Sequence, residues 1–171
     1  MTEQDKQLLL QDLCTRLPYG VKVAIEYSKD KYTKVYDLRE IDNDATSELR
    51  QQVTVWDYGF YSSVISYPLI DCRPYLRPIS SMTEEEKKEL LISILSNKED
   101  TKYFQVMSDG SIDQKDNAVQ ELSNFTFHWI NFDGKNTSSY IDWLNANHFD
   151  YRGLIEKGLA IEVTEENNPY D

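Results

Sequence analysis

The stretch that decides the fold is Arg73–Glu86, which reads RPYLRPISSMTEEE. Proline has no backbone N–H to donate to a β-ladder, so Pro74 and Pro78 predict the edge or the end of a strand. The residue before a proline is held in extended backbone, which places Arg73 and Arg77 in strand-like geometry. A run of β-structure is therefore predicted to end here.

The same stretch also begins a helix. Thr83 is predicted to be the N-cap, and Glu86, three residues later, completes a capping box. Glu84 and Glu85 then lie at the positive end of the helix dipole. Apolar residues recur at helical spacing beyond them, which predicts a central helix over residues 83–96.

Towards the N-terminus, the pattern predicts one helix followed by β-structure. Leucines at helical spacing follow Thr2 and predict a helix over residues 2–17. Alternating or β-branched segments then predict about five short strands, at residues 21–27, 32–41, 53–56, 60–67 and 69–76. Such a set favours a small, bent antiparallel sheet or half-barrel, with its edges blunted by Pro68, Pro74 and Pro78.

Towards the C-terminus, helices and strands are mixed. The expected elements are a hairpin around Asp109-Gly110, an aromatic strand at 124–132, helices at 140–147 and 150–157 and a last strand at 159–163. Gly158 is predicted to end the second helix. The fold class is α+β, with a helix plus antiparallel β-subdomain at 1–80, an α+β subdomain at 81–163 packed on it, and a loose acidic tail at 164–171.

Composition narrows the range of functions. The chain has 171 residues and a net charge of -12. Residues 1–80 hold 12 acidic and 10 basic side chains, so the remaining 18 acidic and 8 basic groups give the second half -10. This field repels phosphates and argues against direct nucleic-acid binding. It leaves open an acidic face that mimics nucleic acid.

Other sequence signals are mostly negative. The chain shows no membrane-span pattern and no secretory leader, so a cytoplasmic protein is expected. Cys14 and Cys72 lie far apart without a C-x-x-C spacing and are predicted to be buried free thiols. We expect no metal site and no cofactor, because His128 and His148 lack ligand spacing and no glycine-rich phosphate loop occurs.

Three strings resemble uncharacterised proteins common in phages and mobile elements of gut Bacteroidetes. They are LCTRLPYGV at 13–21, PYLRPISSMTEEE at 74–86 and DWLNANHFDYRGLIEKGLA at 142–160. The resemblance implies a bacterial cytoplasm during carriage of a phage or mobile element. It brings no activity and no catalytic residue to this chain, and it does not extend to residues 97–135.

One polar cluster has the residue types of an active site. His148 and Asp150 could form an oriented general base, and Arg152 could bind an anion. The simpler interpretation is structural: Asp150 caps a helix, His148 and Arg152 satisfy nearby polar groups, and Tyr151 packs. We favour the structural interpretation, because neither a nucleophile nor a metal ligand accompanies the cluster.

The leading hypothesis is a non-enzymatic binding or adaptor protein of prophage or mobile-element origin, whose partner is a host or phage protein. Aromatic anchors dominate many interfaces, so aromatic sheet surfaces are the expected contact sites. The alternatives are an acidic mimic of nucleic acid that inhibits a host DNA-binding or defence enzyme, and an enzyme built on the polar cluster. The candidate binding residues are Tyr58, Phe60, Tyr61, Tyr67, Phe125, Phe127, Trp129, His148, Asp150 and Arg152.

Overall fold

The computed structural model describes residues 1–26, 33–43, 51–57, 63–95, 98–115 and 134–171. The chain forms two compact units, one of Met1–Arg77 with Arg152–Asp171 and one of Pro78–Tyr151. The last part of the chain thus returns to the N-terminal unit, whereas the predicted division assigned residues 152–163 to the second subdomain. Helices and strands occur in both units, and the α+β class is confirmed.

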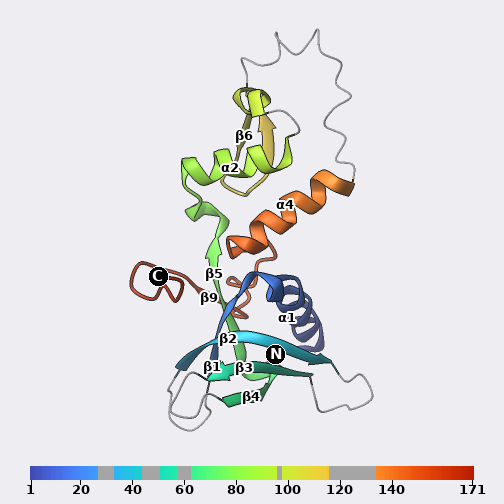
Figure 1. The fold of residues 1–171 in the computed structure, drawn as a ribbon, viewed down its shortest axis with the longest axis vertical. Helices are drawn as coiled ribbons and strands as arrows, with labels where there is room; N and C mark the ends of the chain where they lie inside the picture. The colour runs from blue at the N-terminus through green and yellow to red at the C-terminus, as the bar shows by residue number, and fades with distance from the viewer. Residues whose placement is uncertain (27–32, 44–50, 58–62, 96–97, 116–133) are drawn as a thin grey trace. The chain divides into compact units, whose positions relative to one another are not determined.

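The first unit is built on a mixed sheet with a helix on one face (Figure 1). Its helices are α1 (Glu3–Arg16), η1 (Leu17–Tyr19) and η2 (Leu69–Asp71). Its strands are β1 (Lys22–Glu26), β2 (Thr33–Asn43), β3 (Gln51–Asp57), β4 (Ser63–Pro68), β5 (Cys72–Pro78) and β9 (Ile161–Glu162). The order β4-β3-β2-β1-β5 is antiparallel throughout, and β9 pairs in parallel with β5. The predicted antiparallel sheet therefore gains a parallel strand from the far end of the sequence.

The core of this unit lies between α1 and the inner face of the sheet. Leu9 and Leu13 of α1 are fully buried against strand residues that include Val23, Val53 and Val55. Each such side chain contributes about 1.5–3 kcal/mol by leaving water. The leucines, at helical spacing, and the valines, at every second position of their strands, thus pack together in one apolar layer.

The predicted capping box of Thr83 and Glu86 is present, and Thr2, which precedes the first predicted helix, forms a second one that was not predicted. Thr2 caps α1 and exchanges hydrogen bonds with Asp5. Thr83 caps α2 (Glu84–Ile94): the Glu86 N–H donates to Thr83 Oγ1 at 3.2 Å, and the Thr83 N–H donates to Glu86 Oε2 at 2.8 Å. These caps satisfy N–H groups that the first helical turn leaves without intrahelical partners.

Pro74 does not lie at an edge or a strand end, so that prediction is wrong. It lies inside β5, opposite Val23 of β1. β5 pairs with β1 at Cys72–Pro74 and with β9 at Tyr75 and Leu76, so its two halves use different neighbours. A proline fits such a strand because a strand residue directs its N–H to one side only, and Pro74 has no N–H that needs an acceptor. β5 does end at Pro78, as predicted, and η3 (Ile79–Ser81) leads into α2.

The helix predicted over residues 150–157 is absent. Phe149–Asp150 is the short strand β8, and only one turn follows, from Leu154 to Gly158. Gly158, at φ 66°, ends that turn: its N–H donates to Ile155 O and the Leu159 N–H donates to Leu154 O, both at 2.9 Å. This is a Schellman motif, whose apolar pair Leu154 and Leu159 is buried. The prediction that Gly158 ends a helical segment is correct for this single turn. Gly153, at φ 71°, lies just before the turn, and no helix extends from Asp150 to the turn.

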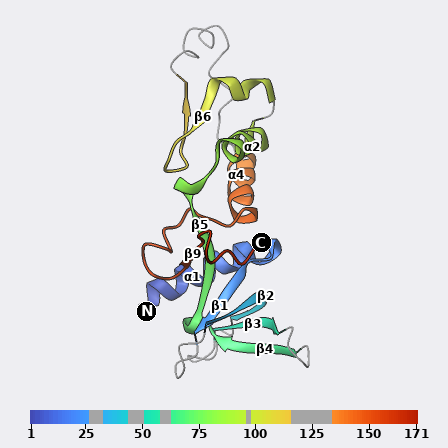
Figure 2. The ribbon, with the colours of Figure 1, turned by 90° about the vertical axis from the view of Figure 1, so that its left-hand side faces the viewer.

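The described part of the second unit contains two α-helices and a small hairpin (Figure 2). Beyond η3 and α2 it contains η4 (Lys98–Tyr103), β6 (Phe104–Val106), β7 (Ile112–Gln114), α4 (Gly134–Ala146) and β8. The hairpin is confirmed as an antiparallel β6–β7 pair, and Tyr140 of α4 donates to Gly110 O in its turn at 2.9 Å. Leu90, Leu144 and Phe149 are fully buried in a core of their own. The aromatic strand predicted at 124–132 lies outside the described residues.

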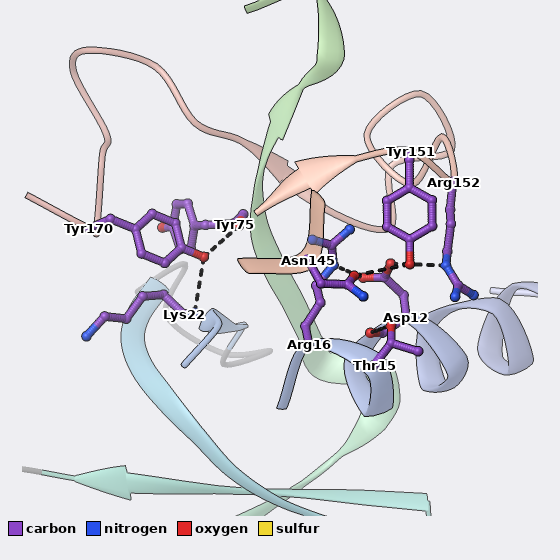
Figure 3. Close-up of polar contacts among 9 residues, drawn as sticks. All are labelled: Asp12, Thr15, Arg16, Lys22, Tyr75, Asn145, Tyr151, Arg152 and Tyr170. Atoms are coloured by element: carbon purple, nitrogen blue, oxygen red, sulfur yellow. Dashed lines mark hydrogen bonds and ion pairs between the residues drawn. The ribbon is translucent and has the colours of Figure 1, made fainter. Parts of the chain in front are cut away.

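The C-terminal tail is anchored at its end, whereas the sequence predicts a loose segment. The Tyr170 hydroxyl donates to Tyr75 O of β5 at 2.8 Å and accepts from the Lys22 N–H of β1 at 3.2 Å (Figure 3). Val23 pairs with Pro74, so the next pair in this register would be Lys22 with Tyr75. The Tyr170 hydroxyl occupies that step of the ladder and bridges the donor and the acceptor. Burial raises the pKa of this hydroxyl, which therefore stays a neutral donor.

Tyr170→Phe keeps the ring and removes both bridging hydrogen bonds. Because the Lys22 N–H and Tyr75 C=O would lose a shared partner, the free energy of unfolding should fall by about 1–3 kcal/mol. Amide hydrogen exchange would test the bridge directly: the Lys22 amide should exchange faster in the variant. Ile25, which pairs with Cys72 in the same two strands, provides the internal control. Unchanged exchange at Lys22 would contradict the bridge.

Candidate binding face

The outer face of the sheet, opposite α1, carries exposed apolar side chains. Tyr36 and Leu38 of β2 point into the core, so their neighbours Val35, Asp37 and Arg39 lie on the other face. The register places Asp37 beside Trp56 of β3, and Trp56 beside Val64 of β4. We call Val35, Trp56 and Val64, with Arg39, the outer-face strip. Val35 is 42% and Val64 56% exposed, and Trp56 is half-buried.

A β-bulge positions the cation of this strip. The register between β2 and β3 shifts between Leu38 and Glu40, so Arg39 is the extra residue of β2. Bulges redirect side chains, and here the Arg39 guanidinium lies over the Trp56 ring, 5.9 Å from its centroid. The Trp56 ring thus has a cation over one of its faces.

Polar contacts surround the apolar side chains. Lys22 Nζ forms an ion pair with Asp37 Oδ1 at 2.6 Å, and the hydroxyl groups of Thr54 and Ser66 lie 3.1 Å apart across β3 and β4. A partly exposed tryptophan and arginine with a satisfied polar surround is the arrangement typical of an interface centre and its rim. The outer-face strip can therefore bind an apolar surface without leaving these polar groups unsatisfied.

The predicted aromatic residues fall in different places. Tyr67 points inward: it packs against the core, and its hydroxyl lies 3.4 Å from that of Tyr36. Tyr58, Phe60, Tyr61, Phe125, Phe127 and Trp129 lie outside the described residues. Sequence reasoning missed Val35, Trp56 and Val64 as site residues. One signal was available, since Trp56 has the opposite parity to Val53 and Val55 within a single strand.

The polar cluster His148, Asp150 and Arg152 is divided between the two units, because the boundary follows Tyr151. His148 has φ 58° and its N–H donates to Asn145 O at 3.1 Å, so it occupies the left-handed position at the end of α4. Asp150 lies in β8, so the expectation that it caps a helix is wrong. Tyr151 donates to Asn145 Oδ1 at 3.1 Å.

Arg152 contributes to a buried group of charges in the first unit (Figure 3). Asp12 Oδ2 lies 2.7 Å from Arg16 Nε, and Asp12 Oδ1 lies 3.5 Å from Arg152 Nε. The side chains of Asp12 and Arg16 are fully buried, and that of Arg152 is 17% exposed. One carboxylate thus joins the C-terminal half of α1 to the segment that follows β8. A buried ion pair of this kind constrains which segments meet.

Several carboxylates that contribute to the net charge also form local contacts. Asp5 and Glu86 complete capping boxes, Glu84 binds Lys87 at 2.6 Å, and Glu26 binds Arg73 at 3.0 Å. Within the described ranges, no group of three or more His, Cys, Asp or Glu side chains could hold a metal ion. The same part of the chain contains no helix long and apolar enough to cross a membrane.

The two cysteines differ in environment. Cys72 is buried, as predicted, and burial raises the pKa of its thiol. Cys14 lies exposed on α1, so the expectation of two buried thiols is wrong for this residue. The leucine spacing of α1 places Leu9 and Leu13 inward and leaves Cys14 beside them on the solvent side.

Comparison of the chain with protein-family models, with curated proteins and with solved structures finds no match. The candidate site therefore depends on its geometry alone.

Asp12→Asn tests the buried charge group. The substitution leaves two guanidinium groups beside a neutral amide, so the free energy of unfolding should fall by about 3–5 kcal/mol in chemical denaturation. Glu3→Gln is the control, because Glu3 pairs with Lys6 at the surface of the same helix and should change stability by less than about 1 kcal/mol. Equal effects of the two substitutions would contradict a structural role for Asp12.

His148→Gly and His148→Ala together test the role of the left-handed position. Both remove the imidazole, and only alanine keeps a Cβ, which is strained at φ 58°. The glycine variant should therefore be more stable than the alanine variant by about 1 kcal/mol in denaturant unfolding. Equal stability would show that the backbone conformation of His148 contributes little.

Proposed function

We propose that this chain is a non-enzymatic binding or adaptor protein that recognises a host or phage protein through the outer-face strip. The observation that supports the proposal is the alignment of Val35, Trp56 and Val64 on one exposed sheet face, with Arg39 held over the tryptophan ring. Tryptophan and arginine are the residues most enriched among interface hot spots. The partner surface that fits this strip is apolar at its centre and carries an acceptor for Arg39 at its rim.

The proposed cellular context is a bacterial cytoplasm that carries a phage or a mobile element. It rests on the resemblance of the strings at 13–21, 74–86 and 142–160. The structural roles of one string explain why its residues occur together. Phe149 stacks on Trp143, with ring centroids 5.7 Å apart, and Tyr151 binds Asn145. The residues of that string thus have structural roles, so the string says nothing about the partner of the protein.

The test is a matched affinity capture from a bacterial lysate. Wild-type protein and Val35→Lys are immobilised at equal density, and retained proteins are compared by mass spectrometry. Val35 is exposed, so the lysine should leave the fold intact while placing a charge in the strip. A true partner should be retained by wild type and reduced by about tenfold or more on Val35→Lys.

Met107→Lys is the control variant for this experiment. Met107 is 41% exposed and belongs to the second unit, so it tests for the general effect of replacing an exposed apolar residue with a charge. The proposal expects Met107→Lys to retain the partner as wild type does. It would be overturned if no protein distinguished wild type from Val35→Lys, or if Met107→Lys lost the same proteins.

A further inference from the structure

The last eleven residues of the sequence attach to both edges of β5. In a strand, consecutive residues direct their backbone groups to opposite edges. On one edge, where β9 pairs in parallel with β5, the Val163 N–H donates to Leu76 O at 2.8 Å. On the other edge, which faces β1, the Tyr170 hydroxyl donates to Tyr75 O at 2.8 Å. We call residues 161–171, which pass from one edge to the other, the C-terminal strap.

Hydrogen bonds hold the C-terminal strap, since every one of its residues is exposed or half-buried. Between its two attachments the strap is folded on itself: the Thr164 N–H donates to Asn167 Oδ1 at 2.6 Å, and Asn167 Nδ2 donates to Glu162 O at 2.9 Å. The strap carries four carboxylate side chains and no basic side chain, so its charge has the same sign as that of the whole chain. Segments that bury so little apolar surface open locally, without unfolding of the domain.

The Tyr170 hydroxyl is inserted into a step of the β1–β5 ladder. Val23 pairs with Pro74, so Lys22 and Tyr75 are the next partners in this register. In an antiparallel ladder, pairs that exchange hydrogen bonds alternate with pairs that do not. The Lys22 N–H and Tyr75 O both face the gap between the strands, where the Tyr170 hydroxyl lies 3.2 Å from the first and 2.8 Å from the second (Figure 3). Without this hydroxyl, the two backbone groups are the donor and the acceptor of one ladder hydrogen bond.

We propose that the C-terminal strap is a two-state device and that Tyr170 is its latch. In the closed state, which is the one described above, the hydroxyl is inserted into the ladder and the strap lies across β5. In the open state the strap leaves β5, the Lys22 N–H donates directly to Tyr75 O, and the β1–β5 ladder gains one pair. Both states satisfy these two backbone groups, so opening does not carry the cost of leaving them buried and unpaired.

The strap controls access to β5. Cys72 and Leu76 belong to the core, so the side chain of Tyr75 points to the outer face, where it is only 7% exposed beside Tyr170. Opening uncovers this side chain and frees the edge of β5 that pairs with β9. The inference is independent of the proposed function, because the residues of the outer-face strip lie on β2, β3 and β4.

Amide hydrogen exchange of the full chain tests the latch with two substitutions of Tyr170. Tyr170→Phe keeps a ring in the ladder step without its hydroxyl, so the Lys22 amide should exchange faster than in wild type. Tyr170→Ala removes the ring as well, so the strap should open and the ladder step should close. The Lys22 amide should then exchange about tenfold or more slowly than in Tyr170→Phe, and the Val163 amide about tenfold or more faster than in wild type.

Wild type provides a measurement that needs no variant: the Val163 amide should be about tenfold or more less protected than that of Ala24, which pairs with Arg73 in the same sheet. Glu166→Ala is the control variant, because it changes an exposed strap side chain and should leave exchange at Lys22 and Val163 as in wild type. Equal protection of Val163 and Ala24 in wild type would overturn the proposal. So would an unchanged Val163 amide in Tyr170→Ala, or a Lys22 amide that exchanges as fast in Tyr170→Ala as in Tyr170→Phe.

Discussion

The structure of the first unit depends on how the backbone of β5 is satisfied. Buried N–H and C=O groups need hydrogen-bond partners, and β5 obtains several of them from distant parts of the chain. Cys72–Pro74 pair with β1, Tyr75 and Leu76 pair with β9, and the Tyr170 hydroxyl bridges Tyr75 O to the Lys22 N–H. The Val163 N–H adds a bond to Leu76 O at 2.8 Å. One strand thereby joins the N-terminal hairpin to the last residues of the sequence.

Side chains strengthen the same connection. Asp12 of α1 contacts both Arg16 and Arg152, and Arg73 of β5 contacts Glu26 and the Gly158 carbonyl. One of these contacts engages Arg152, a residue of the polar cluster whose residue types are those of an active site. Its nearness to His148 and Asp150 in sequence suggested anion binding, and its observed partner is a buried carboxylate. The charge of Arg152 thus contributes to the fold of the first unit.

The surface proposed for binding is the outer face of the sheet. The inner face is covered by α1, whose leucines fill the core, and Tyr67 packs against that core. Val35, Trp56 and Val64 come from three strands, and only strand pairing places them together. The bulge at Arg39 adds a cation to the same strip. A protein-binding role would use this exposed face of the sheet.

The sequence by itself determined the local elements. Thr83 and Glu86 form the predicted capping box within four residues, the β6–β7 hairpin follows from a short turn, and Gly158 takes the left-handed position that a Schellman motif requires. These features depend on neighbours in the chain, so spacing alone predicts them. The tertiary structure decided the contacts between distant segments: the parallel pairing of β9, the Tyr170 bridge, the Asp12–Arg152 ion pair and the outer-face strip. Each of these contacts joins residues that are far apart in the sequence. They come together only when folding buries their side chains or sets the register of their strands.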